Sequence, residues 1–138
     1  MRNLDLAHDY IKRAGVRLAA LDVLYGGESG ADVVRESQEV VELALKALLR
    51  ASGVDVPRVH DVSPILMAER TRLPEGLAPH LDELADASRQ LRRDRELAFN
   101  GAEDLTPSAF YARTDADRAL SYARRVVELV SQHLPDAV

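Results

Sequence analysis

The densest group of basic side chains in the sequence consists of four arginines within seven positions. They are Arg89, Arg92, Arg93 and Arg95. Arg95 lies four residues after Leu91 and four before Phe99, inside the apolar stripe of the helix expected here. An isolated buried charge is unfavourable by several kcal/mol, so this guanidinium must be paired, line a cleft or lie at a subunit interface. Together the arginines predict a local positive surface for phosphate, unless Asp94 and Glu96 pair with them on a solvated helix face.

A second candidate is a polar strip at Gln38, Glu42 and Lys46, which follow one another at four-residue intervals. Side chains at this spacing share one face of a helix, and Glu before Lys is the favourable order for an ion pair. The spacing allows two interpretations. Either Glu42 and Lys46 form a surface pair that contributes a few tenths of a kcal/mol, or the strip meets Arg95 or a ligand.

The histidines do not predict a metal site. They are His8, His60, His80 and His133. No two of them have the His-x-x-x-His spacing, none follows a glutamate by three residues, and the chain has no cysteine, so we expect neither a metal nor another cofactor. The turn at residues 26–30 lacks the Gly-Lys-Ser/Thr of a phosphate loop, and we interpret it as a connection between helices.

Length and composition predict a single domain over residues 1–138, with 46% hydrophobic residues to form its core. The formal net charge is −5, so any contact with nucleic acid needs a local basic patch and not bulk attraction. The absence of cysteine favours the cytoplasm. The charged first residues are unlike a secretory signal, and no uncharged apolar run reaches the about 20 residues of a membrane span, so we expect no membrane association.

The fold class expected is all-α. Aromatic residues are only 4% of the chain, and strong helix formers dominate it. Apolar residues recur at intervals of three and four, which predicts a single up-and-down bundle of four long helices and one short helix. The expected helices lie near residues 4–26, 30–52, 62–72, 77–99 and 114–133. Apolar residues cover half or more of the second helix, so it is the expected central helix.

Capping residues mark several of the expected helix starts. Asn3 is placed to cap the first helix. Ser29, with Asp32 three residues later, resembles a capping box at the start of the second. Thr114, with Asp117 three residues later, is the expected cap of the last.

Leu43 lies on the otherwise polar arc of the second helix, among Glu39, Lys46 and Arg50. A monomer does not need an exposed leucine there, although single exposed leucines are common. We therefore expect a two-fold homodimer that uses this residue.

These segments, taken together, resemble the HEPN domain of prokaryotes and higher eukaryotes. One anchor is SQEVVELALKALLRASG at residues 37–53, with His60 and Asp61 soon after. The other is LRRDRELAFNG at residues 91–101. The likeness continues from Pro107 into ALSYARRVVELV and so covers nearly the whole chain.

The resemblance implies a helical bundle that pairs into a homodimer, often encoded beside a small nucleotidyltransferase in toxin–antitoxin pairs. Many members are metal-independent ribonucleases, in which an arginine near the end of the fourth helix is followed four to six residues later by histidine. The corresponding arginine here is Arg95, and the histidine would fall at Asn100, Gly101 or Ala102. None of these three residues is histidine, and residues 81–132 contain no histidine at all.

We therefore expect a HEPN-like domain that binds nucleotide or RNA, acts with a small nucleotidyltransferase, and has little or no ribonuclease activity. Arginine steadies a phosphate but does not accept a proton near neutral pH. The candidate ligand-binding residues are Arg95, which is also the catalytic candidate, Arg92, Arg89, Glu42, Lys46 and Asn100. Two alternatives stay open. One is a metal-independent ribonuclease in which His60, oriented by Asp61, or Tyr111 is the substitute base, and the other is a protein-interaction module without a ligand.

Overall fold

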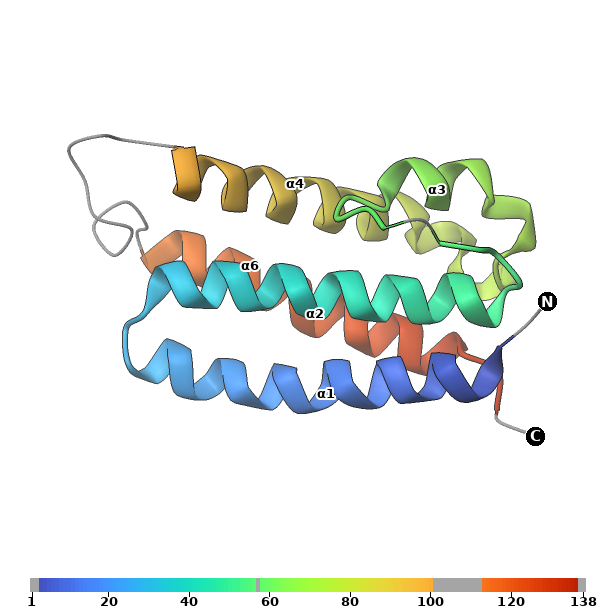
Figure 1. Ribbon diagram of the computed structural model, residues 1–138, viewed down its shortest axis with the longest axis horizontal. Helices are drawn as coiled ribbons and strands as arrows, with labels where there is room; N and C mark the ends of the chain where they lie inside the picture. Colours follow the sequence, from blue (N-terminus) through green and yellow to red (C-terminus); the bar gives the residue numbers. More distant parts are fainter. Residues whose placement is uncertain (1–2, 57, 101–112, 137–138) are drawn as a thin grey trace.

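Four long helices run antiparallel to one another in a single bundle, as the sequence predicts (Figure 1). A computed structural model describes residues 3–56, 58–100 and 113–136, and for residues 95–100 it describes the backbone alone. This part of the chain contains no strand. The helices are α1 (Leu4–Gly26), α2 (Gly30–Ala51), α3 (Ser63–Ala68), η1 (Arg70–Arg72), η2 (Glu75–His80), α4 (Leu81–Asn100) and α6 (Arg113–His133).

The core is built around α2, which packs against α1, α4 and α6 and is the central helix expected from its broad apolar surface. Its buried apolar residues include Val40, Leu45, Leu48 and Leu49. Leu43, the expected dimer contact, is half-buried and packs against this same core. The prediction that Leu43 is exposed is therefore wrong, because neighbouring elements cover the arc that appears polar on an isolated helix.

Two helices are shorter than their apolar patterns predict. The segment predicted as one helix over residues 62–72 forms α3, which has Pro64 in its first turn, and then the 3₁₀ turn η1. The helix predicted over residues 77–99 forms α4 only from Leu81 onward. The residues before it form the 3₁₀ helix η2, which contains Pro79. Proline has no N–H to donate to the preceding turn, so the regular α-helix begins after it.

Two of the three predicted capping residues stand at the start of their helix, and one of them makes the capping hydrogen bond. The side chain of Asn3 accepts a hydrogen bond from the backbone N–H of Leu6 at 3.0 Å, as predicted. Ser29 is the N-cap residue of α2, as predicted, but its hydroxyl donates to the Asp32 carboxylate at 2.5 Å and forms no capping hydrogen bond. Helix α6 begins at Arg113, so Thr114 lies within its first turn and is not the cap.

No helix in the described ranges is both long enough and apolar enough to cross a membrane.

Candidate functional site

A carboxylate on the central helix collects three hydrogen bonds. Glu42 Oε1 accepts from Lys46 Nζ at 2.6 Å, and Oε2 accepts from Gln38 Nε2 at 3.0 Å. The same Oε2 lies 3.1 Å from Nδ1 of His60, which belongs to the connector between α2 and α3. We refer to Gln38, Glu42, Lys46 and His60 as the Glu42 cluster. The predicted ion pair of Glu42 and Lys46 is therefore present, but it is not an exposed surface pair, because the Glu42 side chain is only 11% exposed.

The carboxyl of Glu42 is held in its ionised form. Burial raises its pKa, whereas hydrogen bonds from Lys46, His60 and Gln38 and the charge of Lys46 lower it, and the net shift is downward. A carboxylate only accepts hydrogen bonds, so Nδ1 of His60 is the donor in this contact. In a neutral imidazole this leaves Nε2 with a free lone pair.

Asp61 does not orient His60, contrary to the expectation from their adjacency. Its Oδ1 accepts from the backbone N–H of Ser63 at 2.9 Å and from the hydroxyl of Ser88 on α4 at 3.2 Å. The same Ser88 hydroxyl accepts from the backbone N–H of Val62 at 3.1 Å, and Ser88 is itself buried. The connector is therefore fastened to α4 directly after His60, while the histidine contacts α2.

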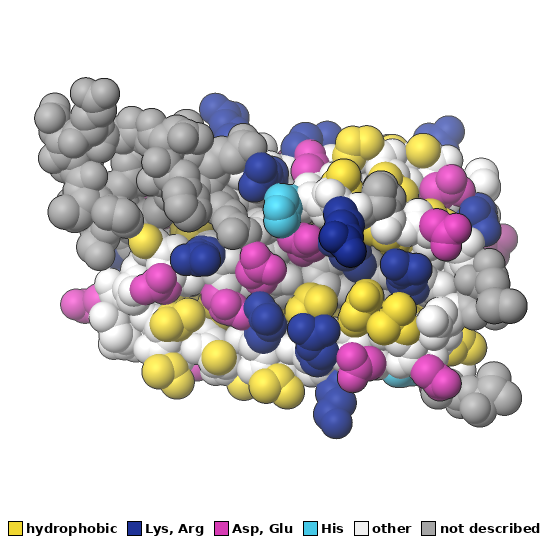
Figure 2. All heavy atoms as spheres, viewed as in Figure 1, with side chains coloured by type: hydrophobic (Ala, Val, Ile, Leu, Met, Phe, Trp, Pro, Cys, Tyr) yellow, Lys and Arg dark blue, Asp and Glu magenta, His cyan; other side chains and the backbone are white. Residues whose placement is uncertain are grey.

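Three arginines of α4 have described side chains, and all three lie at or near the surface. Arg89 is exposed and lies 3.7 Å from the Asp86 carboxylate, Arg92 is half-buried and Arg93 is exposed. Asp94, expected to pair with these arginines, accepts a hydrogen bond from Arg118 of α6 at 2.8 Å. In the view of Figure 2 basic and acidic side chains alternate over the molecule, without one continuous basic field.

The connector residue His60 was the hardest part of the site to predict. Glu42 and Lys46 are one helical turn apart, so their spacing alone identifies the pair. His60 follows Glu42 by 18 residues across a segment without periodicity, and the residue beside it in sequence, Asp61, is the wrong partner. No signal in the sequence distinguishes these two carboxylates.

Comparison with known protein families matches the HEPN domain to residues 7–133, nearly the whole chain. The chain belongs to the HEPN domain family. No curated protein and no solved structure matches it.

In this HEPN domain Arg95, which the resemblance matched to the family motif, lies in the last turns of α4, whose helix continues to Asn100. The side chains of Arg95 and Asn100 are outside the described residues, and so is Tyr111. The expectation that Arg95 faces a cleft or a dimer interface therefore stays a prediction. Among the described residues of the HEPN domain, no group of three or more acidic, histidine or cysteine side chains is placed to hold a metal ion.

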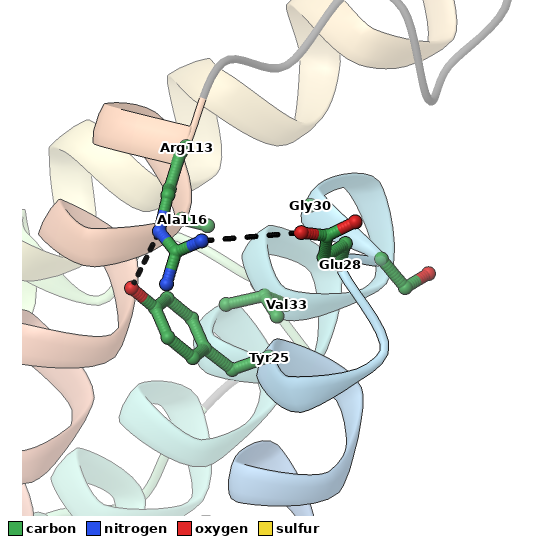
Figure 3. A pocket seen from close by; sticks show the side chains of 7 residues that line it. Tyr25, Glu28, Gly30, Val33, Arg113 and Ala116 are labelled. Carbon is green, nitrogen blue, oxygen red and sulfur yellow. Dashed lines mark hydrogen bonds and ion pairs between the residues drawn. The ribbon is translucent and has the colours of Figure 1, made fainter.

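A small cavity lies at the α1–α2 turn of the HEPN domain, which the sequence predicts to be a plain connection (Figure 3). Its volume is about 190 Å³. Arg113 from α6 stacks over the Tyr25 ring at 5.1 Å, donates to the Tyr25 hydroxyl at 3.2 Å and lies 4.0 Å from Glu28. The Tyr25 hydroxyl in turn donates to Asp117. The polar groups of this cavity thus bind one another and fasten α6 to the turn.

Proposed function

We propose that this HEPN domain binds nucleotide or RNA by its phosphates, through Arg89, Arg92 and Arg95 of α4. The observation that supports this most directly is the position of Arg89 and Arg92 on the part of α4 to which the connector is fastened by Ser88. Guanidinium groups offer paired donors that match phosphate oxygens. The connector also contacts α2 through the Glu42 cluster. The proposed ligand would therefore lie near the connector, between α2 and α4.

The α4 arginines hold phosphate without turning it over. Cleavage of RNA by internal attack needs a group that takes the proton of the 2′-hydroxyl, and a guanidinium stays protonated at any relevant pH. Residues 81–132 contain no histidine that could follow Arg95 as a base. The arginines of α4 alone would therefore bind RNA without cleaving it.

Fluorescence anisotropy with a short labelled RNA and with a nucleotide tests this function. We expect Arg89→Ala with Arg92→Ala, and Arg95→Ala alone, to weaken binding. Each lost contact should lower the slope of log affinity against log salt concentration by about 0.7. Arg124→Ala with Arg125→Ala is the matched control, because these arginines of α6 already pair with Asp22 of α1 and with Glu83 in the first turn of α4, at 2.9 and 2.8 Å. Equal losses of affinity in the α4 variants and in the control would refute binding at α4. If the wild type does not bind RNA or nucleotide, a protein-interaction module is favoured.

We also propose a homodimer, which many HEPN proteins form, and assign it to α1. Among the described residues the exposed large hydrophobic side chains are Val16, 65% exposed, and Val23, 77% exposed. Both lie in the half of α1 near the α1–α2 turn, where hydrophobic side chains gather in Figure 2. Antiparallel pairing of two copies around Ala19 and Ala20 places Val16 of one copy against Val23 of the other.

The remaining parts of the proposal concern the cellular setting. We propose a small nucleotidyltransferase as a partner in a toxin–antitoxin type system in the cytoplasm. The HEPN membership supports the partner, and the lack of cysteine supports the compartment. Co-purification with the product of a neighbouring nucleotidyltransferase gene is the expected result, and independent elution of the two proteins would contradict it.

A further inference from the structure

We propose that the cavity at the α1–α2 turn binds a guanine base of single-stranded RNA. Its walls include Tyr25, Glu28, Val33 and Arg113. The inference rests on the proposed function, because the phosphates of that RNA are held by the α4 arginines. It goes beyond that function because it names the base that the domain recognises and assigns its recognition to a site on other elements.

The size and position of the cavity suit one base. Its volume of about 190 Å³ is smaller than the pockets of about 300 to 1,000 Å³ that enclose drug-sized ligands, so it has room for a flat ring system and not for a whole nucleotide. Val33 and Ala116 give the cavity an apolar wall. Helix α4 ends at the same end of the bundle as the α1–α2 turn (Figure 1). An RNA strand that follows α4 toward its last turns therefore approaches the cavity.

Arg113 offers a flat surface on which a base can stack. One face of its guanidinium lies over the Tyr25 ring, 5.1 Å from the ring centroid, and its Nε donates to the Tyr25 hydroxyl at 3.2 Å. The Tyr25 hydroxyl donates to Asp117, which also belongs to α6. The Arg113 side chain is nevertheless 70% exposed, so the other face of the guanidinium is open to a ligand. Unpaired RNA bases stack on such guanidinium planes.

Glu28 supplies the acceptors that select the base. Its carboxylate faces Arg113 across the space over Val33 in the view of Figure 3, but it lies 4.0 Å from Nη1, too far for a hydrogen bond. Among the residues that the structure describes, no other side chain is paired with this carboxylate. Both oxygens are therefore free to accept. Guanine is the one standard RNA base with two adjacent donors, N1–H and the N2 amino group, and these match the two oxygens of a carboxylate.

The backbone holds this glutamate against its local preference. Glu28 has a φ of 56°, and in the described part of the chain it is the only residue other than glycine with a positive φ. The turn at residues 26–30 has glycines on both sides of Glu28, and glycine adopts this left-handed conformation readily. Backbone strain of this kind tends to occur where side chains clamp ligands. The side chain of Glu28 thus gives a reason for its presence at a position that suits glycine.

The test measures the affinity of the full chain for short labelled oligouridines by fluorescence anisotropy. Each RNA carries one guanine, adenine, cytosine or inosine at its centre. We expect the guanine RNA to bind about 10-fold more tightly than the adenine and cytosine RNAs, the size of one bidentate base contact. The inosine RNA should lose most of this preference, because inosine lacks only the N2 amino group.

Two glutamate variants separate base recognition from general charge effects. Glu28→Gln should abolish the preference for guanine, because an amide has only one acceptor oxygen. Glu75→Gln makes the same change of charge on η2, beside His133 at the other end of the bundle, and should keep the preference (Figure 1). Glu28→Gly suits the left-handed backbone, so it should unfold at no lower temperature than the wild type and still lose the preference.

The outcomes separate this inference from the proposed function. Equal affinity of the wild type for all four RNAs would overturn the guanine site and leave phosphate binding by α4 intact. A preference for guanine that persists in Glu28→Gln or Glu28→Gly would also overturn the site. Arg89→Ala with Arg92→Ala should show the opposite pattern, in which every RNA binds more weakly and the preference is kept.

A second measurement needs no RNA strand. Guanosine 5′-monophosphate should shift the backbone amide NMR signals of Gly30, Val33 and Ala116, which line the cavity, and adenosine 5′-monophosphate at the same concentration should not. These shifts in a protein that does not bind RNA would support the cavity and contradict the α4 surface. If neither nucleotide shifts these signals and no RNA binds, both proposals are overturned.

Discussion

Two glutamates of this HEPN domain have the same kinds of neighbour in different surroundings. Glu42 contacts Lys46 at 2.6 Å and His60 at 3.1 Å, and Glu83 contacts Arg125 at 2.8 Å and lies 3.7 Å from His80. The Glu42 side chain is 11% exposed and that of Glu83 is 42% exposed. A buried carboxylate with several donors holds its histidine at hydrogen-bond distance, whereas an exposed one shares its partners with water. Burial, and not residue type, therefore distinguishes the two sites.

The same difference predicts unequal energies. Exposed ion pairs contribute about 0 to 1 kcal/mol, because water screens the charges and the side chains lose freedom when they pair. Removing one partner of a buried pair has a larger effect, since it leaves the other partner desolvated without a hydrogen bond. The predictions below test this contrast, from the largest expected effect to the smallest.

Glu42→Ala should lower the free energy of unfolding by about 2 to 3 kcal/mol, because it removes the carboxylate that accepts hydrogen bonds from buried Gln38 and half-buried Lys46. Glu83→Ala should lower it by less than about 1 kcal/mol. Urea denaturation followed by circular dichroism measures both. Equal losses of stability at the two positions would contradict the claim that burial makes the interactions of Glu42 stronger than those of Glu83.

The pH dependence of stability should reflect Glu42. Its pKa is lowered in the folded state, so its contribution is present above the pKa of the unfolded chain, about 4.3, and is lost as the pH falls through the lower folded value. The free energy of unfolding of the wild type should decrease more steeply over this acid range than that of Glu42→Gln. Urea denaturation at a series of pH values gives the slopes, and parallel slopes would contradict the prediction.

Ser88→Ala should have an intermediate effect of about 1 kcal/mol, because it removes the hydrogen bonds that fasten Val62 and Asp61 to α4. Amide hydrogen exchange at Val62 should accelerate in this variant. Ser121→Ala, on the exposed side of α6, is the control and should change neither quantity. Unchanged exchange at Val62 would show that Ser88 does not hold the connector.

The smallest effect on stability is expected at the outer face of α1. Val16→Ser with Val23→Ser removes exposed side chains, so the free energy of unfolding of the monomer should change by less than about 0.5 kcal/mol. Light scattering should nevertheless show a dimer for the wild type and a monomer for the variant. A wild type of about 15 kDa at micromolar concentration would contradict the dimer itself.

The local features of the fold could be predicted well from the sequence. Apolar spacing places α1 and α2 within a residue of their observed ends, and the cap at Asn3 forms as expected. The four-residue spacing of Glu42 and Lys46 identifies their ion pair, because a helix places these positions on one face. The short helices were harder, since prolines near residues 64, 74 and 79 allow both α-helical and 3₁₀ turns.

Contacts between distant segments could not be predicted in this way. The partner of His60 was sought in Asp61, its neighbour, and proved to be Glu42 on another element. Leu43 appeared exposed because only its own helix was considered, and the packed elements around α2 cover it.

The sequence by itself determined the helices, the family and the supply of charged side chains, because these depend on residue type and on spacings within a few turns. Only the tertiary structure decided which charges are buried and which histidine has a carboxylate partner. Those properties arise where α2, α4 and the connector meet. The sequence of a segment without periodic apolar residues does not indicate which surface the segment packs against.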